Sequence, residues 1–204
     1  MLTETWLFIA KGLMLGLHGV TMNRSELPVL RGARVTLRRP QPDDVERRLL
    51  LGNDPDIVRM YGGSSAVSPA MSEAEALRWV QKVQDHDHAW VIEAGSLIGS
   101  IRLDRVDRHD KRAALAVGID DRTRLGQGLG TEAMGLVLHY AFEVLKLHRI
   151  AVRVVAYNAR ALRAYQKCGF VIEGREREAA FVDGTWHDDV MMGLLDREFV
   201  RTSP

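Results

Sequence analysis

A glycine-rich loop is the first part of the sequence whose residue types and spacing suggest chemistry. Residues 125–131 have the sequence LGQGLGT, with glycines at Gly126, Gly128 and Gly130. Because glycine lacks Cβ, the backbone can turn tightly and its N–H groups can converge on an anion. A helix expected to start near Thr131 adds unpaired N–H donors and a positive dipole end. The loop therefore predicts a pyrophosphate site, with a glycine-rich turn that binds nothing as the alternative.

Two better-known phosphate motifs do not fit this loop. A P-loop ends in Gly-Lys-Ser/Thr, whereas Gly130 is followed directly by Thr131. A dinucleotide fingerprint, G-x-G-x-x-A, is matched by Gly128, Gly130 and Ala133. That motif follows directly on its first strand and needs an acidic residue at the end of the second. Both requirements fail here, so dinucleotide binding is rejected.

A second group of residues has the pattern N-x-R-A-x-x-x-Y-x-x-x-G-F between Asn158 and Phe170. Asn158 can cap a helix over residues 159–167, and Gly169 can end it. Tyr165 has the helical spacing at which a lone tyrosine usually packs in a core. The pattern therefore predicts a capped helix with Tyr165 on its packed face.

Taken together, the segment Gly126–Ala133 (GQGLGTEA) and the Asn158–Phe170 pattern resemble the GNAT superfamily of N-acetyltransferases. The segment Asp183–Leu194 (DGTWHDDVMMGL) is similar to the RimJ/RimL-type branch, which contains ribosomal-protein N-terminal and spermidine acetyltransferases. The resemblance extends from about Arg34 to Leu195. It implies an acyltransferase that moves the acetyl group of acetyl-CoA, its acyl-donor co-substrate, directly to a primary amine.

The resemblance also implies roles for individual residues. Pyrophosphate would be held by the main-chain N–H groups of Leu125, Gly126, Gln127, Gly128, Leu129, Gly130 and Thr131. The pantetheine arm would pair with a strand at Val117, Gly118 and Ile119, where that strand splays away from residues 150–155. Asn158 would hydrogen-bond the cofactor, and Tyr165 would face its sulfur. The family's loop often begins with Arg or Gln where this chain has Leu125, so Arg122 or Arg124 is expected to compensate.

Acetyl transfer requires two proton transfers. Tyr165 has a reference pKa of about 10, so it is neutral at pH 7 and suited to protonate the leaving thiolate. A main-chain N–H near Ile119 would stabilise the oxyanion. The sequence does not assign the base that deprotonates the amine, and Glu93, Asp104 and Asp120 are all candidates. A module that binds coenzyme A without catalysis, as a sensor, is the competing function.

The acceptor amine stays open between an N-terminal peptide, a polyamine and an amino-sugar. Its pocket is expected between residues 43–84 and the C-terminal hairpin. Acids there would suit a cationic amine, although such charges more often form a solvated surface. These acids are Asp43, Asp44, Asp54, Asp56, Asp183, Asp188 and Asp189.

An α+β fold is expected to position these motifs. The periodicity predicts a mixed sheet flanked by helices, with an antiparallel meander over residues 89–92, 97–103 and 113–119. Helices are expected near 44–51, 72–84, from 131 onward and at 159–167, with further strands at 34–39 and 150–155. A strand should begin at 170–173, and a final hairpin (178–182 and 186–195) should turn at Asp183-Gly184. The family resemblance adds that the sheet is mostly antiparallel and that strands 113–119 and 150–155 splay apart.

Composition limits the remaining alternatives. The chain has 204 residues and a formal net charge of +1, which argues against a nucleic-acid binder. A single cysteine excludes an internal disulfide and favours the cytoplasm. Residues 6–20 are apolar but too short to span a membrane. We therefore expect an N-terminal extension (1–24), either helical or an over-extended start, and one N-acetyltransferase domain (25–204), with a homodimer left open.

Two His/Asp clusters resemble metal sites or catalytic triads. Residues 85–88 have the sequence Asp-His-Asp-His, but no further ligand set accompanies them, so no metal is predicted. Residues 187–189 have the sequence His-Asp-Asp after the hairpin turn, without a serine or activated cysteine to complete a triad. Substrate contact or a solvated turn are the two interpretations of this segment.

Overall fold

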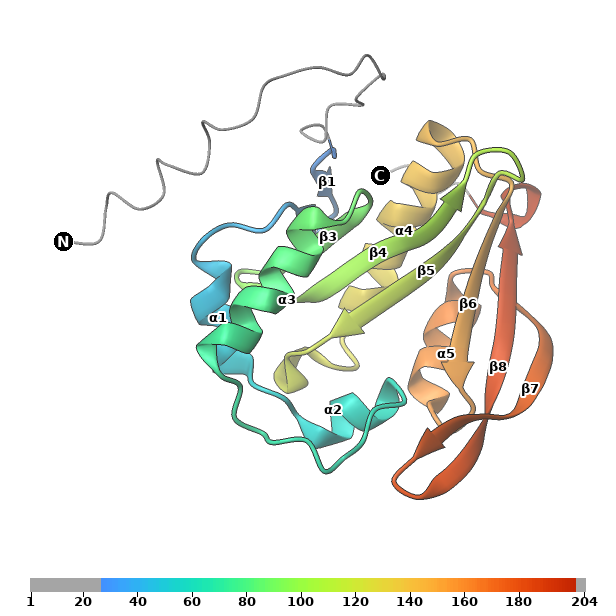
Figure 1. Cartoon of the computed structure of the whole chain (residues 1–204). Coiled ribbons are helices and arrows are strands. Elements are labelled where there is room, and N and C mark those ends of the chain that lie inside the picture. The colour runs from blue at the N-terminus through green and yellow to red at the C-terminus, as the bar shows by residue number, and fades with distance from the viewer. Residues whose placement is uncertain (1–26, 201–204) are drawn as a thin grey trace, which may run out of the picture.

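The structure is a computed structural model that describes residues 27–200, so the expected N-terminal extension lies outside the described residues. Helices flank an eight-stranded sheet of order β1-β2-β3-β4-β5-β6-β8-β7 (Figure 1). The strands are β1 (Leu30–Arg31), β2 (Thr36–Arg38), β3 (Ala89–Glu93), β4 (Leu97–Asp107), β5 (Arg112–Ile119), β6 (Arg149–Val155), β7 (Val171–Val182) and β8 (Thr185–Leu195). The α-helices are α1 (Asp44–Leu51), α2 (Pro55–Met60), α3 (Glu73–Asp85), α4 (Leu129–His139) and α5 (Ala159–Lys167). The π-helical η2 (Tyr140–Val144) continues α4, and η1 (Arg122–Arg124) and η3 (Asp196–Glu198) are short 3-10 turns.

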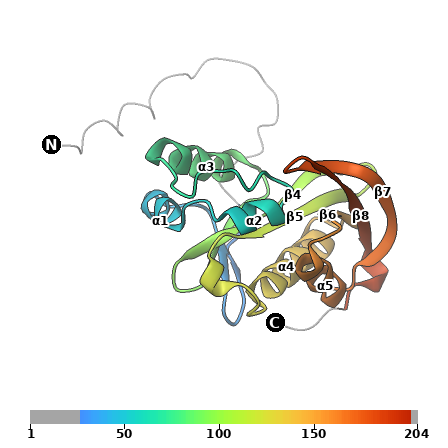
Figure 2. The ribbon, with the colours of Figure 1, turned by 90° about the horizontal axis from the view of Figure 1, so that it is seen from below.

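The sheet separates two layers of helices. Seen from below, α4 and α5 lie on one face of the sheet, and α1, α2 and α3 lie on the other (Figure 2). Every strand pair among the described residues is antiparallel except β5 with β6, which is parallel. This arrangement confirms the predicted α+β class with its mixed, mostly antiparallel sheet.

The parallel pair β5–β6 separates soon after it forms. Residues 112–114 of β5 pair with residues 149–151 of β6, and the pairing stops there. The rest of β5, up to Ile119, pairs with β4, while β6 pairs with β8 along its whole length to Val155. The C-terminal ends of two neighbouring strands are therefore parted, which confirms the expected splay.

An apolar stripe along α4 and η2 forms the centre of the core. Met134, Val137, Leu138 and Ala141 are buried with the inward-facing residues of β6, while Leu145 packs at the edge. The helix begins at Leu129, two residues earlier than predicted. Gly128 provides the N-cap in a left-handed conformation, with φ of +80°, and Leu129 is already part of the core.

The C-terminal strands differ from the prediction in one respect. Residues 171–182 form the single strand β7 rather than two segments, because register shifts between Ile172 and Gly174 and between Glu176 and Ala180 absorb the extra residues. The predicted turn at Asp183-Gly184 is confirmed, since both residues have positive φ, +48° and +81°. The two-residue strand β1 was not predicted, because it is too short to show alternation.

Gly99 on β4 keeps the end of β5 in place, and its substitution tests this close approach. It pairs with Ile119, and a Cβ atom there would lie 2.0 Å from the carbonyl oxygen of Gly118. We expect Gly99→Ala to lower the free energy of unfolding by about 1–3 kcal/mol, the usual cost of overpacking. Urea denaturation measures this cost. Gly174→Ala is the control, because a Cβ there meets nothing within 4 Å. Equal losses in the two variants would contradict the close-approach argument.

Candidate active site

The glycine loop has the geometry of an anion site. Gly126 and Gly128 have φ of +76° and +80°, so the tight turn that the sequence predicted is present. No hydrogen bond joins the backbone N–H groups of residues 126–131 to another described residue. The last of these residues open α4, where the first-turn N–H groups have no partner within the helix. Loop and helix together thus present a run of free donors.

Side chains fix the shape of this loop. Arg34 donates to the carbonyl oxygen of Gln127 at 2.9 Å and pairs with Glu132 in the first turn of α4 at 2.8 Å. Gln127 in turn donates to the carbonyl oxygen of Thr123 at 2.7 Å. Partial burial of Glu132 raises its pKa, but the hydrogen bonds from Arg34 and Val35 outweigh it and hold this pKa below the ordinary value. The loop is therefore preformed.

Arg122, one of the two arginines expected to compensate for Leu125, is engaged elsewhere. Arg122 donates to the carboxylates of Asp54 at 2.8 Å and of Asp56 at 2.9 Å. These contacts tie η1 to the start of α2. Within the loop the donors left free are main-chain N–H groups, since the side-chain amide of Gln127 is already bonded to Thr123.

The gap between β5 and β6 is bridged by the end of α2. The hydroxyl of Tyr61 donates to the carbonyl oxygen of Ile119, the last residue of β5, at 3.1 Å. From the other side, Tyr157 and Asn158, which follow β6, donate to the carbonyl oxygens of Arg59 and Met60. The ring of Tyr61 is half exposed, but a Cβ atom on Gly118 would lie 2.9 Å from its hydroxyl. Tyr61 therefore belongs to the site, although sequence reasoning missed it.

Asn158 is both a helix cap and a tertiary contact. Its Oδ1 accepts a hydrogen bond from the N–H of Ala161 at 3.0 Å, as the sequence predicted, and its Nδ2 donates to Met60 at 2.9 Å. The side chain is buried, so both bonds are made away from water. The predicted contact of Asn158 with a cofactor stays a prediction.

Tyr165 packs in the core, as a lone tyrosine at this helical spacing usually does. It is buried in the core and packs edge-on against Phe170, with ring centroids 5.4 Å apart. Burial, and then Cys168, raise the pKa of Tyr165 to about 12. Tyr61 lies within electrostatic reach of it. The hydroxyl of Tyr165 therefore holds its proton firmly, and its predicted approach to the cofactor's sulfur stays a prediction.

The three candidate bases have different surroundings. Glu93 is paired with Arg38, and Asp104 accepts hydrogen bonds from Arg102 at 2.9 Å and 3.0 Å. Asp120 directly follows Ile119, and the arginine nearest to it, Arg48, is 3.9 Å away. Burial raises the pKa of Asp120, opposed by Arg48. The structure thus distinguishes Asp120 as a carboxylate at the gap that is not neutralised by a close ion pair.

The acids expected to line an acceptor pocket mostly bind other parts of the protein. Asp183, at the hairpin tip, accepts hydrogen bonds from Ser64 and Ser65, which fastens β7 and β8 to the loop after α2. These contacts hold the pKa of Asp183 below its ordinary value. The other pairs are Asp44 with Arg38, Asp54 and Asp56 with Arg122, Asp188 with Arg175, and Asp189 with Arg153, while Asp43 begins α1 without a side-chain cap.

The histidine clusters make ordinary tertiary contacts. His86 bonds Asp104 at 3.0 Å, and the ring of His187 packs edge-on against Tyr157 at 4.8 Å. Residues 27–200 contain no group of three or more His, Cys, Asp or Glu side chains that could hold a metal ion. Within the same range, no helix is long and apolar enough to cross a membrane.

Comparison with known proteins points to one family. The model of the acetyltransferase (GNAT) domain matches residues 34–171. The "Putative ribosomal N-acetyltransferase YdaF" of Bacillus subtilis is 29% identical over 171 residues, which cover 81% of this chain and 93% of that protein. The spermidine N(1)-acetyltransferase of Vibrio cholerae is 30% identical over 123 residues, covering 58% and 70%. A structure of spermidine N-acetyltransferase from Vibrio cholerae, in complex with CoA and spermine, superposes with a TM-score of 0.68 at 27% identity, covering 82% of this chain and 98% of that one.

Proposed function

The chain belongs to the acetyltransferase (GNAT) family and is an acyltransferase, and on that premise we propose that it moves the acetyl group of acetyl-CoA directly to a primary amine. The observation that carries the proposal is the parted β5–β6 pair beside a run of free backbone N–H groups. These N–H groups suit a pyrophosphate, and the open edge of β5 near Val117, Gly118 and Ile119 suits an extended amide-containing arm. The cofactor would supply the activated thioester.

Asp120 would accept the proton that the amine must lose. Amines titrate near ~8 to ~10, so an ammonium acceptor must be deprotonated before it becomes a nucleophile. The carboxylate of Asp120 lies at the end of β5, and its raised pKa makes it a stronger base than an ordinary aspartate. Glu93 and Asp104 each form a close ion pair with an arginine, which makes them weaker bases, so Asp120 is favoured as the base.

Tyr165 would donate a proton or a hydrogen bond to the leaving sulfur. With a pKa of about 12, its hydroxyl stays protonated at pH 7. Full transfer to a thiolate with a reference pKa near ~8.5 is uphill, so the hydroxyl would act mainly by hydrogen bonding. Burial also raises the pKa of Cys168 to about 11, which leaves its thiol a poor nucleophile and favours direct transfer.

The first test is binding of acetyl-CoA. At about 100 times its dissociation constant, the ligand should stabilise the protein by roughly 2.7 kcal/mol, visible in a thermal melt. Gly130→Val, at the first turn of α4, should weaken this shift, because its side chain would lie against Ile119, beside the free N–H groups that are proposed to hold the phosphates. Gly135→Val in the same helix is the control, since a Cβ there meets nothing within 4 Å. Unchanged binding by Gly130→Val would place the phosphate contacts elsewhere.

The second test removes the hydroxyl of Tyr165. Tyr165→Phe preserves the packing against Phe170, so the fold and the affinity for acetyl-CoA should change little. Turnover should fall roughly 10²-fold, the lower end of the range for positioned acids, because the hydroxyl is a weak proton donor. Steady-state kinetics with the best amine, beside calorimetry for acetyl-CoA, measures both. Wild-type turnover in this variant would remove Tyr165 from the mechanism.

The third test concerns pH. A base must be ionised, so kcat/KM should rise with pH through the pKa of Asp120, which burial places above that of an ordinary aspartate. Asp120→Asn should lower kcat/KM by about 10²-fold or more and abolish this acidic limb. Asp104→Asn is the control and should keep the limb, because its carboxylate is bound by Arg102. A limb that persists in Asp120→Asn would assign it to another group.

The acceptor is proposed to be a polyamine or an N-terminal peptide, because relatives bear the names of spermidine and ribosomal acetyltransferases. Release of coenzyme A, followed with a thiol reagent across a panel of amines, discriminates between them. A protein that binds acetyl-CoA but releases coenzyme A with none of them would instead be a sensor module.

A further inference from the structure

Asp189 is buried without adequate hydrogen bonding. It is 1% exposed, the lowest value among the buried charged residues of the described chain. Neither of its carboxylate oxygens accepts a hydrogen bond from another described residue. Arg153 lies 3.3 Å away but makes no hydrogen bond with it, and the side chain of Arg153 is 64% exposed. A buried carboxylate in this state is costly unless a better partner binds it.

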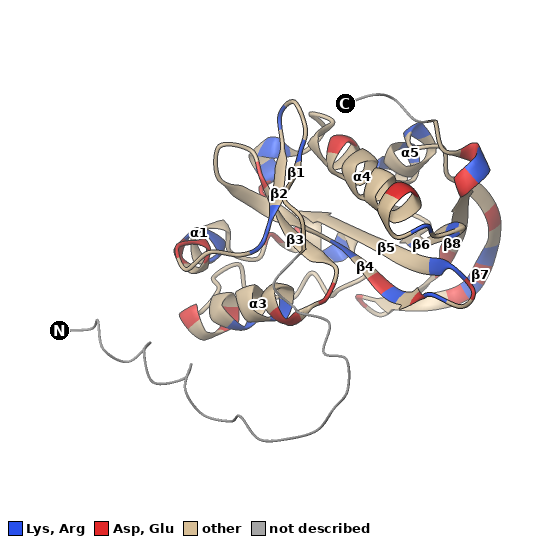
Figure 3. Ribbon diagram, turned by 90° about the horizontal axis from the view of Figure 1, so that it is seen from above, with Lys and Arg blue, Asp and Glu red and all other residues tan. Residues whose placement is uncertain are grey.

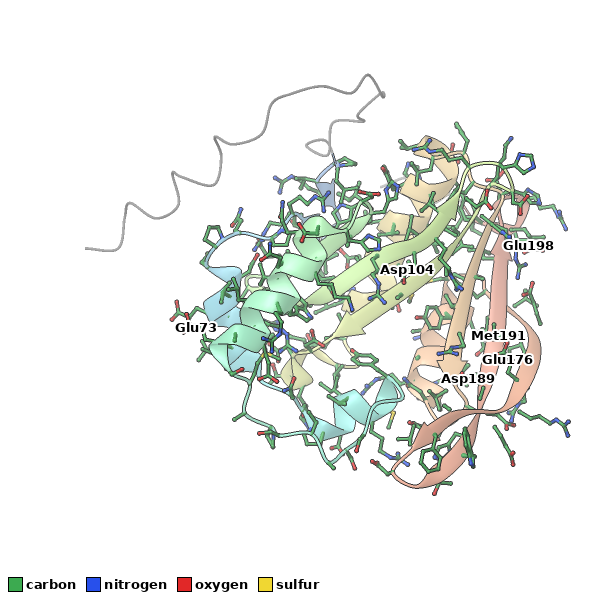
Figure 4. The ribbon with its side chains drawn as sticks, in the orientation of Figure 1. Glu73, Asp104, Glu176, Asp189, Met191 and Glu198 are labelled. Atoms are coloured by element: carbon green, nitrogen blue, oxygen red, sulfur yellow. The ribbon has the colours of Figure 1, made fainter. Side chains whose placement is uncertain are left out.

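The position of Asp189 connects it with the gap between β5 and β6. Val190, Met192 and Leu194 of β8 lie in the core beneath α4, so the alternation of the strand places Asp189 on the opposite face. Its register partner is Val155, the last residue of β6, at the end that has parted from β5. Figure 4 shows Asp189 close to Glu176 and Met191 on this side of the sheet.

Like charges gather around this carboxylate. Glu176 of β7 is directly opposite Asp189 in the register, an arrangement that destabilises a sheet. Burial raises the pKa of Asp189, Arg153 opposes this, and Glu176 and Asp188 add to the rise. Figure 3 shows how densely acidic and basic residues follow one another along β7. A bound cation would relieve both the repulsion and the missing hydrogen bonds.

We propose that Asp189 and Glu176 bind a second, non-reacting ammonium group of the acceptor, which displaces Arg153 from Asp189. The acceptor class is therefore an aliphatic diamine or polyamine, an inference that rests on the proposed acetyl transfer. An ammonium group carries three N–H donors, so it can donate to both carboxylates at once. In the sheet, β6 lies between β8, which carries Asp189, and the parted end of β5. The ammonium group at Asp189 and the reacting amine at β5 are therefore separated by two strand spacings, on the order of 10 Å.

The test compares α,ω-diaminoalkanes of increasing length with n-alkylamines of the same length. The wild-type protein should prefer the diamine in kcat/KM by about 10-fold or more at the best length. Asp189→Asn should reduce this ratio about 10-fold. Arg153→Gln should increase the ratio of diamine to monoamine kcat/KM and lower the KM for the diamine, because the arginine that competes for Asp189 is gone. Arg175→Gln, which removes the partner of Asp188 instead, is the matched control and should keep the wild-type ratio.

Opposite effects of the Asp189 and Arg153 variants on the ratio would support the site. If the two residues formed only a structural ion pair, either substitution would break that pair and both variants would change in the same way. Should Asp189→Asn fail to fold, Glu176→Gln at its exposed neighbour must reduce the ratio instead. A wild-type ratio near one at every length, or a ratio unchanged in both acid variants, would overturn the inference. Release of coenzyme A with the monoamines would still stand in that case, so failure of this site and failure of acetyl transfer are distinguishable.

Discussion

The separation of β5 from β6 is the constraint on which the rest of the site depends. The sheet consists of an antiparallel block, β1 to β5, and a second block of β6, β8 and β7, joined by three register pairs. Beyond those pairs, backbone donors and acceptors that a continuous sheet would satisfy must find other partners. Side chains provide these partners. Tyr61, at the end of α2, donates to the carbonyl oxygen of Ile119 on β5, and Tyr157 and Asn158, which follow β6, donate to carbonyl oxygens of α2. The gap is held open by polar contacts instead of being closed by further pairing.

Because the two blocks part, groups from distant segments meet at one place. The glycine loop and α4 follow β5, while Asn158 and Tyr165 follow β6. Asp120 directly follows β5, and Tyr61 directly follows α2. Asp183 fastens the hairpin of the second block to the loop after α2. Hydrogen bonds therefore fasten both sides of the site, and the opening between them leaves the end of β5 unpaired with β6.

Local patterns predicted the elements well, because each is encoded within a few neighbouring residues. The Asn158 cap and the Asp183-Gly184 turn are both present. What escaped prediction depends on contacts between distant segments. Tyr61 meets Ile119 across 58 residues. The choice of Asp120 among three acids required knowing which carboxylates have close arginines, and that follows only from the fold.

The polar groups beside the opening between β5 and β6 differ in how well the described residues satisfy them. Asn158 uses both ends of its amide within the protein, so its burial strengthens the fold. Asp189 is buried without a hydrogen-bond partner, and the partly buried Asp120 has only a distant arginine, so each weakens the fold. Both lie beside the parted ends of β5 and β6, where a cationic acceptor would have to lie. A folded chain retains such costs most readily where a ligand relieves them, and this explains why the poorly satisfied carboxylates gather at the opening while the satisfied groups hold it apart.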